Sequence, residues 1–470
     1  MGKVYLVGAG CGNLDLYTVK AMKCIENADC LVYDQLVDHR ILLKVKDDCE
    51  CIYVGKQAAN HAMKQEDINQ MLVDKSKQYD SVVRLKGGDV FVFGRGGEEA
   101  QLLYDNHIDF EVVPGLSSVT AGLAYAGVPI THRGMSGGFQ VYTGSLKQNE
   151  ERIFDFSTML DDYCTYVFLM SMSKLNKIVE GFKEAGKHIA TPVAIISKAS
   201  MPSQRVLVGT LENIVEKFQA APLDNPGIIV VGEVVKMREI LNFYENKPLF
   251  SKKCLVTSIG HDYSLFEKLN DLGANAHHVM TGMIEYLDVD IPRLDGVLVF
   301  TSKHGVIGFM NNFKKQYKDL RALKDVLIVS IGKKTNEVLN EYGLDSDFIP
   351  SKADSDYLNE ELQGFAKGRC IYLIKGENET NIKDYHKSFV VYRNNNVTID
   401  SKVNHYDYGF FTCASSVKRF KTYNDSVIDV FVSIGKHTSN AIRECYGDVK
   451  ILETDKAVKE HMIDVVLRGE

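Results

Sequence analysis

Short apolar runs alternate with turns and amphipathic stretches along the first part of the chain. Val4–Val7, Cys30–Tyr33 and Cys51–Val54 are each four apolar residues long, and each run is followed at once by a glycine or an acid. Short apolar runs of this kind are typical of strands buried on both faces. Their alternation with helical segments predicts a parallel α/β layer over residues up to about 135.

A second α/β block is predicted to begin near Gly138 and to end near residue 245. Its expected strands are Gln140–Thr143, Tyr166–Leu169, Val193–Ile196 and Ile228–Val231. Residues 246–252 are interpreted as a linker, because Pro248 interrupts any helix there. The chain is therefore predicted to hold a two-part domain at 1–245, with subdomains at about 1–135 and 138–245, and a further α/β domain at 253–470.

The C-terminal domain contains an internal repeat. Val299–Val306 is echoed by Phe410–Val417, and Val329–Thr335 is echoed by Val432–Thr438. Each copy has a strand that ends in hydroxyl residues or glycine before a helix. This pattern predicts hydroxyls and amides at helix N-termini, where anionic groups are bound without a metal. The alternative is that the serines and threonines are only helix caps.

Two glycine turns lie close together between Val82 and Glu99. The first contains Gly87, Gly88 and Asp89, and the second follows it after only a few residues. Glycine allows backbone amides to approach a ligand, and an acid at a strand end can bind a ribose or an amino group. A ligand-binding turn is therefore predicted, with an ordinary strand–turn–helix corner as the alternative.

Asp34 and Lys56 follow neighbouring predicted strands, at the edge of an open α/β sheet where ligands collect. Together they are interpreted as an acid/base pair. Taken singly, Asp34 would be a turn acid and Lys56 a solvated surface lysine.

The amino-acid composition of the chain narrows the classes of function that it can have. With 470 residues the chain should hold at least two domains, and 45% hydrophobic and 25% charged residues are typical of a globular protein. A net charge of -7 argues against nucleic acid as the main partner. The ten cysteines are scattered, which favours reduced thiols in the cytoplasm. No leader peptide and no apolar run of membrane-spanning length is apparent, so a cytoplasmic protein is expected.

Residues 1 to about 245 resemble the tetrapyrrole methylase family, and within it the uroporphyrinogen-III C-methyltransferases. The segments that carry the resemblance are Gly8–Gly12, Val32–Val37, Tyr53–Lys56, Val82–Glu99, Val113–Gly115, Gly127–Arg133 and Val231–Val235. The resemblance implies S-adenosyl-methionine bound between two α/β domains of a homodimer. It places cofactor contacts on Cys11, Gly87, Gly88, Asp89, Val92, Ser117, Ser118, Met170 and Ala199.

The same resemblance implies that Asp34 is a proton acceptor and Lys56 a proton donor. Arg95 is a further candidate for binding an acidic substrate, or else a structural ion-pair partner. The chain departs from the family pattern at Cys11 and Val90, where proline is usual, and at Lys198–Ala199, where asparagine–glycine is usual. Backbone contacts should survive these changes, so altered affinity rather than lost activity is expected.

The C-terminal half looks like the uroporphyrinogen-III synthases, a family with two similar α/β lobes. One lobe would span 285–392 and be inserted in the other, 253–281 plus 398–470. The resemblance implies substrate contacts at Thr301, Ser302, Thr335, Ser415 and Thr438, and a catalytic acid at Tyr392. Departures from the family pattern are Ser258 in place of arginine, Cys413 in place of serine, and a shortened stretch from Gly376 to Phe389.

The two resemblances predict a bifunctional enzyme of tetrapyrrole biosynthesis. Its C-terminal half would cyclise hydroxymethylbilane to uroporphyrinogen III. Its N-terminal half would methylate that product twice to precorrin-2, which feeds siroheme or cobalamin. S-adenosyl-methionine is the expected methyl donor, and no metal and no membrane or nucleic-acid partner is expected. Two alternatives stay open: a related RNA or protein methyltransferase, and an active methyltransferase with a degenerate, tetrapyrrole-binding C-terminal module.

Overall fold

The computed structural model describes residues 1–470 except 56–62, 145–153, 353, 378–380, 398–402 and 470. The chain folds into two compact units. One comprises Met1–Lys252 with Asp271–Asn275, and the other comprises Lys253–Asn270 with Ala276–Glu470. Within the described parts, no helix is long and apolar enough to cross a membrane.

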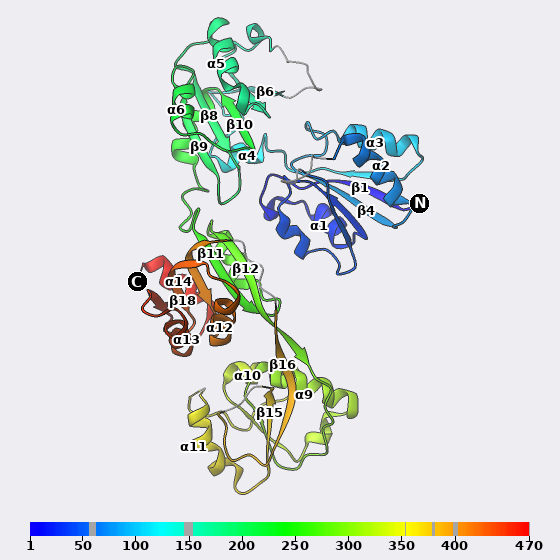
Figure 1. Ribbon diagram of the computed structural model, residues 1–470, viewed down its shortest axis with the longest axis vertical. Coiled ribbons are helices and arrows are strands. Elements are labelled where there is room, and N and C mark those ends of the chain that lie inside the picture. Colours follow the sequence, from blue (N-terminus) through cyan, green and yellow to red (C-terminus); the bar gives the residue numbers. More distant parts are fainter. Residues whose placement is uncertain (56–62, 145–153, 353, 378–380, 398–402, 470) are drawn as a thin grey trace. The chain divides into compact units, whose positions relative to one another are not determined.

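The first unit begins with a five-stranded sheet in the order β3-β2-β4-β1-β5, and every neighbouring pair is parallel (Figure 1). The strands are β1 Lys3–Gly8, β2 Cys30–Tyr33, β3 Glu50–Tyr53, β4 Ser81–Lys86 and β5 Phe110–Val113. The prediction of a parallel α/β layer is thus confirmed. Because all five strands run the same way, the segments that follow them leave the sheet at one edge.

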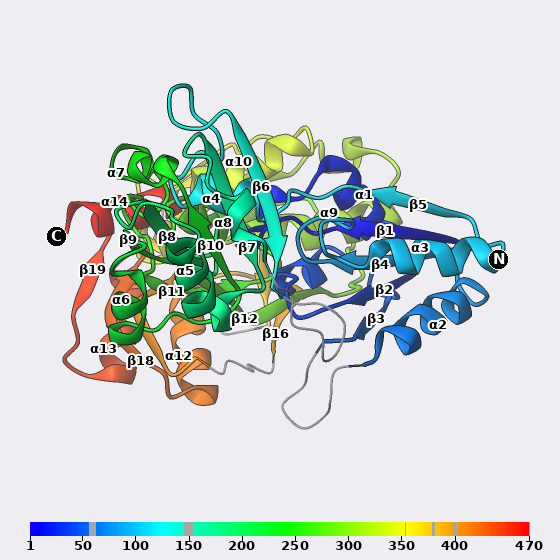
Figure 2. The same ribbon diagram turned by 90° about the horizontal axis from the view of Figure 1, so that it is seen from above.

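Helices cover both faces of this sheet. The helices are α1 Val19–Glu26, α2 Gln65–Ser76 and α3 Gly96–Asp105, whereas α4 Ala121–Tyr125 packs through Leu123 on the second sheet of this unit. Leu72 of α2 and Leu103 of α3 pack with Val82 on one face. Ile25 of α1 packs with Val83 on the other. Figure 2 shows α1 and α2 on opposite sides of the strands. Burying a leucine or isoleucine side chain stabilises the fold by about 1.5–3 kcal/mol.

A second sheet of the same unit has the order β6-β7-β10-β8-β9. Its strands are β6 Gly138–Thr143, β7 Cys164–Leu169, β8 Pro192–Ser197, β9 Arg205–Thr210 and β10 Gly227–Val231, and its helices are α5 Leu175–Glu184, α6 Ile214–Ala220 and α7 Arg238–Leu241. Strand β10 is antiparallel to both neighbours, β7 and β8. Strands β7 and β8 therefore run the same way and end at the same edge.

The second unit is built on one nine-stranded sheet in the order β14-β13-β15-β16-β12-β11-β17-β18-β19. The strands are β11 Lys253–Ile259, β12 Asn275–Tyr286, β13 Val297–Phe300, β14 Leu327–Ser330, β15 Ile371–Gly376, β16 Lys387–Asn396, β17 His405–Phe411, β18 Val427–Ser433 and β19 Ile451–Glu453. Strands β12 and β16 pair antiparallel. They separate two parallel groups, β13–β15 and β17–β19.

The repeat seen in the sequence is a repeat of strand–helix units in the fold. Strands β13 and β17 lead into α9 and α12, and strands β14 and β18 lead into α10 and α13. The helices of this unit are α8 Ser264–Asp271, α9 Lys303–Gln316, α10 Lys333–Glu341, α11 Ser355–Ala366, α12 Ala414–Tyr423, α13 Lys436–Tyr446 and α14 Lys459–Arg468. Short 3-10 turns lie at Leu14–Leu16, His39–Leu43, Phe156–Thr158, Met172–Lys174, Glu233–Met237 and Leu320–Leu323.

Candidate functional site

Three glycine turns meet at the carboxyl edge of the first sheet. Gly10 and Gly88 exchange backbone hydrogen bonds of 3.1 and 2.8 Å. A Cβ atom on Gly115 would lie 2.3 Å from the Gly88 carbonyl oxygen. The close approach of these backbones therefore requires glycine, and it joins the turns after β1, β4 and β5.

Asp89 shapes this junction with its carboxylate. Its Oδ1 atom accepts hydrogen bonds from the amides of Phe91 (2.9 Å) and Val92 (3.2 Å). Its Oδ2 atom accepts from the Gly115 amide at 3.2 Å. A carboxylate has about four acceptor positions, so roughly one remains for a ligand. Asp89 therefore mainly stabilises the turn, and one acceptor position of its carboxylate stays available to a ligand.

The junction has the features that a nucleoside-bearing ligand needs. At Gly88, where φ is +72°, an added Cβ would meet no atom within 4 Å. The backbone is therefore open to approach from that side. Next to it Phe91, Val92 and Phe93 are exposed by 59%, 39% and 39%. Exposed apolar side chains around an accessible backbone suit the apolar faces of S-adenosyl-methionine, so the residues present fit this group.

Two positions at which the chain departs from the family pattern touch each other. The Cys11 thiol donates a hydrogen bond to the Ala199 carbonyl at 3.7 Å. Burial raises the pKa of Cys11 to about 11, so the thiol keeps its proton near neutral pH. The Ser200 hydroxyl donates to the Cys11 carbonyl and accepts from the Asn13 amide at 3.3 Å. These contacts join the turn after β1 to the turn after β8.

Met170 and the segment around Ala199 lie at one edge of the second sheet. Ile228 of β10 pairs with Leu169 on one side and Ile196 on the other, so β7 and β8 end level with each other. Met170 is 52% exposed and has a φ of +52°. Positive φ is unusual for a residue with a side chain. The exposed methionine is therefore a functional candidate rather than a core residue.

Ser117 and Ser118 form the turn that leads into α4. Their carbonyls accept hydrogen bonds from Ala121 at 2.9 Å and Gly122 at 3.0 Å. The Ser117 hydroxyl also accepts from the Val119 amide at 3.3 Å. The turn lies beside the glycine junction because it follows β5 directly after Gly115. Both serines are half-buried.

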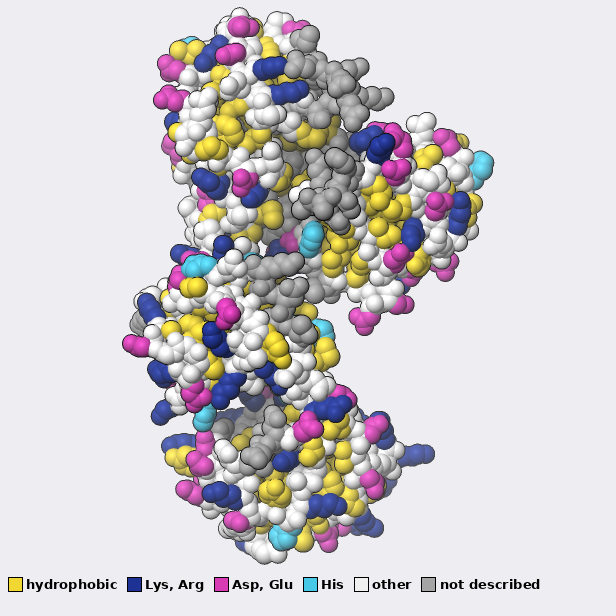
Figure 3. Space-filling view, in the orientation of Figure 1, with side chains coloured by type: hydrophobic (Ala, Val, Ile, Leu, Met, Phe, Trp, Pro, Cys, Tyr) yellow, Lys and Arg dark blue, Asp and Glu magenta, His cyan; other side chains and the backbone are white. Residues whose placement is uncertain are grey.

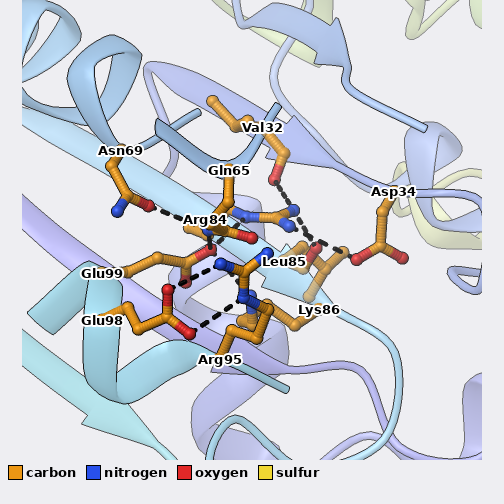
Figure 4. Close-up of polar contacts among 10 residues, drawn as sticks. All are labelled: Val32, Asp34, Gln65, Asn69, Arg84, Leu85, Lys86, Arg95, Glu98 and Glu99. Carbon is orange, nitrogen blue, oxygen red and sulfur yellow. Dashed lines mark hydrogen bonds and ion pairs between the residues drawn. The ribbon is translucent and has the colours of Figure 1, made fainter. Parts of the chain in front are cut away.

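Asp34 follows β2 at the same sheet edge and contacts Arg84 (Figure 4). Oδ1 accepts from the Leu36 amide at 3.1 Å, and Oδ2 lies 3.4 Å from the Arg84 guanidinium. The side chain is 28% exposed. Asp34 therefore offers a fixed, solvent-accessible carboxylate. Lys56, its expected partner, lies outside the described residues.

Beneath Asp34 lies a buried ionic cluster that the sequence analysis missed. Glu99, in the first turn of α3, accepts from Lys86 Nζ at 2.7 Å, Gln65 Nε2 at 3.0 Å and Arg84 Nε at 3.3 Å (Figure 4). Burial lowers the pKa of Lys86. Arg84 and Lys86 are two positions apart on a buried strand and so share a face. Charged residues with that spacing in an apolar strand are the signal that could have revealed the cluster.

Arg95 caps α3 with a φ of +59° and points along the helix surface. Its Nε and Nη2 atoms donate to the two carboxylate oxygens of Glu98 at 2.9 and 2.7 Å. Both side chains are about half exposed. An exposed pair contributes no more than about 1 kcal/mol, so Arg95 can exchange Glu98 for a substrate carboxylate.

In the second unit, Tyr392 lies in a polar group with residues of β12 and α9. Its hydroxyl is 3.0 Å from the Ser302 hydroxyl, which also caps α9 by accepting from the Gly305 amide at 3.0 Å. Tyr286 is the β12 residue directly paired with Tyr392. The Tyr286 hydroxyl is 3.1 Å from His304 Nδ1.

This group places two tyrosine hydroxyls and one imidazole on neighbouring elements. Burial, with a smaller effect from Lys303, lowers the pKa of His304 to about 4. The imidazole is therefore neutral at physiological pH, with one ring nitrogen that donates a hydrogen bond and one that accepts. Tyr286 and His304 were not identified from the sequence, because nothing in their spacing links them to Tyr392.

Among the remaining candidates of this unit, Thr335 and Thr438 lie at matching places in the two repeats. Thr335 and Thr438 each occupy the third helical position after a glycine cap, in α10 and α13, and both are buried. Thr301 donates to the Ile374 carbonyl at 3.4 Å. Ser415 lies 3.2 Å from the thiol of Cys413, the cap residue of α12. Ser302 is both a cap and a site candidate.

Comparisons with known proteins find one family model in each half of the chain. Residues 3–215 match the family model of Tetrapyrrole (Corrin/Porphyrin) Methylases. Residues 264–464 match that of Uroporphyrinogen-III synthase HemD.

Curated relatives match over different lengths. The "Porphyrin biosynthesis protein HemD" of Ruminiclostridium josui is 33% identical over 99% of this chain and 98% of its own length. The "Uroporphyrinogen-III C-methyltransferase" of Methanocaldococcus jannaschii is 46% identical over 50% of this chain and 98% of its own. The chain spans 50% of the "Siroheme synthase" of Psychrobacter sp., to which it is 43% identical. Among solved structures, the "Uroporphyrin III C-methyl transferase" of Thermus thermophilus is 36% identical, covers 50% of this chain and 99% of that chain, and has a TM-score of 0.43.

Fold, site and comparisons define a bifunctional enzyme of tetrapyrrole biosynthesis, in which an S-adenosyl-methionine-dependent methyltransferase half is fused to a synthase half. The predicted fold class, activity and family are thereby confirmed. The chain belongs to the tetrapyrrole methylases over its N-terminal half and to the uroporphyrinogen-III synthases over its C-terminal half.

Proposed function

We propose that the N-terminal half transfers two methyl groups from S-adenosyl-methionine to uroporphyrinogen III, giving precorrin-2. The observation that carries this proposal is the junction of glycine turns after β1, β4 and β5, with the turn after β8 joined to it through Cys11 and Ser200. The cofactor contacts would be Cys11, Gly87, Gly88, Asp89, Val92, Ser117, Ser118, Met170 and Ala199. S-adenosyl-methionine supplies a sulfonium methyl when bound.

The protein's own residues orient the substrate and handle its proton. A pyrrole carbon forms the new C–C bond while the S–CH₃ bond breaks and its electron pair stays on sulfur. The methylated carbon already carries an acetate side chain and has no hydrogen, so the resulting cation loses a proton from a pyrrole nitrogen or from a neighbouring bridging carbon. Asp34 accepts that proton, because its carboxylate is fixed and 28% exposed. Arg95 binds a substrate carboxylate, and Lys56 is the proposed proton donor.

We propose that the C-terminal half cyclises hydroxymethylbilane to uroporphyrinogen III. Tyr392 donates the proton with which the hydroxyl leaves as water, and the Ser302 hydroxyl 3.0 Å away holds the phenol in place. Thr301, Ser302, Thr335, Ser415 and Thr438 would bind substrate carboxylates at helix N-termini. The domains proposed for these activities are 1–245 and 253–470, joined by a linker at 246–252.

Cellular context and assembly are part of the same proposal. A homodimer formed through the methyltransferase half and a cytoplasmic location are proposed. No disulfide joins any of the ten cysteines, as expected in a reducing compartment. On the face shown in Figure 3, Lys and Arg side chains are interspersed with Asp and Glu. This surface and the net charge of -7 favour a tetrapyrrole over RNA as the methyl acceptor.

One assay tests both activities. The purified chain receives hydroxymethylbilane and S-adenosyl-methionine, and product absorbance is followed with a parallel reaction started from uroporphyrinogen III. Precorrin-2 from both starting materials supports the proposal. Precorrin-2 from uroporphyrinogen III alone would reject the synthase assignment and favour a degenerate binding module. Turnover of neither substrate would reject the methyltransferase assignment.

A further inference from the structure

We propose that Arg84 is a positioning residue for methyl transfer. Its guanidinium, anchored by the buried Glu99 carboxylate, fixes the position of the Asp34 carboxylate. This inference rests on the proposed role of Asp34 as the proton acceptor. It concerns a residue inside the sheet that does not touch the substrate.

The Arg84 guanidinium is held on all sides (Figure 4). Its side chain is 4% exposed. Nη1 donates to the carbonyls of Leu85 at 3.0 Å and Val32 at 3.4 Å, and Nε donates to Glu99 Oε1 at 3.3 Å. These contacts leave Nη2 pointing at Asp34 Oδ2, 3.4 Å away. A planar guanidinium tied at its other nitrogens has a fixed orientation.

Asp34 is therefore held between a backbone amide and a side chain. The Leu36 amide binds Oδ1 at 3.1 Å, and Arg84 faces Oδ2. Both oxygens are thus restrained while the carboxylate stays 28% exposed. A base fixed in this way keeps its lone pairs directed outward. Misplacement of a catalytic group by about 1 Å can lower a rate by about 100-fold.

The Arg84 guanidinium lies between two carboxylates, the fully buried Glu99 and the 28% exposed Asp34. Lys86 also contacts Glu99, at 2.7 Å, so the buried carboxylate keeps one cation when Arg84 is altered. A change at Arg84 therefore acts mainly on the position of Asp34.

The test is a double-mutant cycle in the full-length protein with uroporphyrinogen III as substrate. The variants are Arg84→Lys, Asp34→Asn and the double variant. The lysine keeps a cation next to Glu99, so that folding is preserved, but an ammonium group cannot hold Glu99, two carbonyls and Asp34 at once. Lys75→Met is the matched control, because Lys75 of α2 forms a 2.6 Å ion pair with Glu50 of β3, away from Asp34.

We expect Arg84→Lys to lower kcat by about 10- to 100-fold. The KM for S-adenosyl-methionine and the Kd for S-adenosyl-homocysteine, measured by calorimetry, should stay within about twofold. The double variant should be no slower than Asp34→Asn, because Arg84 acts through Asp34.

Multiplicative losses in the double variant would overturn the inference while leaving Asp34 as the base. An unchanged kcat in a folded Arg84→Lys protein would overturn it as well. Full-rate methylation by Asp34→Asn would instead remove the base assignment, and the inference with it. A failure of the Arg84 inference can thus be distinguished from a failure of the Asp34 base assignment.

Discussion

The hydroxyl groups of Tyr392 and Ser302 lie 3.0 Å apart, although 90 positions separate the two residues in the chain. Ser302 also accepts from the Gly305 amide and so begins α9. Because the Ser302 oxygen already accepts from the Gly305 amide, the Ser302 hydroxyl can donate its own proton to the Tyr392 oxygen. The phenol proton of Tyr392 is then available to a substrate. The residue that caps α9 and the candidate acid are therefore joined by one hydrogen bond.

Tyr392→Phe should therefore abolish most of the synthase activity. Removing a general acid lowers a rate by about 10²- to 10⁴-fold. Conversion of hydroxymethylbilane to uroporphyrinogen III is the measurement, with methylation of preformed uroporphyrinogen III as the internal reference. Tyr372→Phe is the control, since its hydroxyl contacts Asp295 at 3.2 Å in the same unit. Equal rates for both variants would exclude Tyr392 as the acid.

Gly115→Ala should damage the methyltransferase half. The new Cβ would lie 2.3 Å from the Gly88 carbonyl oxygen, so the turns after β4 and β5 must separate. We expect a loss of about 1–3 kcal/mol in the free energy of unfolding, together with weaker S-adenosyl-homocysteine binding by calorimetry. Gly97→Ala is the matched control, because an added Cβ there meets nothing within 4 Å. Unchanged binding in Gly115→Ala would show that the junction does not form the cofactor site.

Ser200→Ala should loosen the connection between the turn after β1 and the turn after β8. Ser200 is fully buried, and its hydroxyl binds the Cys11 carbonyl and the Asn13 amide. Loss of these bonds should cost about 1–2 kcal/mol in urea unfolding and lower the affinity for S-adenosyl-homocysteine. Ser157→Ala, at an exposed hydroxyl bonded to Asp155 at 2.5 Å, should change neither quantity. If both variants behave alike, the Ser200 contact does not hold the site together.

Acidification should destabilise the second unit through His304. Burial lowers the pKa of this imidazole from 6.5 to about 4, so the unfolded chain binds the proton first as the pH falls. The stabilisation is complete above about pH 6.5 and is lost between 6.5 and about 4. Its size is at most about 3 kcal/mol, reduced by the partial exposure of the ring. His278 on β12, whose pKa burial also lowers, adds a loss of the same sign.

The measurement is the urea midpoint of the second unit in the full-length protein from pH 7.5 to 4.5. His304→Gln should flatten this dependence, while His405→Gln, at an exposed position, should leave it unchanged. A dependence as steep in His304→Gln as in the parent protein would contradict the assignment.

The sequence by itself determined the classes of structure and the family. Apolar runs such as Val4–Val7 predicted the parallel sheet because a strand buried on both faces must be apolar throughout. The repeat of Val329–Thr335 in Val432–Thr438 predicted repeated strand–helix units, since both copies obey the same local rules. Glycine turns and the hydroxyls that follow strands are local signals, and they marked the edge of the sheet.

Only the tertiary structure decided which side chains meet. The contacts of Arg84 with Asp34, of Cys11 with Ala199 and of Tyr392 with Ser302 join residues 50, 188 and 90 positions apart. Strand order and register bring them together, and neither follows from local periodicity. The buried Glu99 is the clearest case. Its residue type predicts a solvated helix start, whereas the packing of α3 on β4 makes it the anion that holds two buried cations in place.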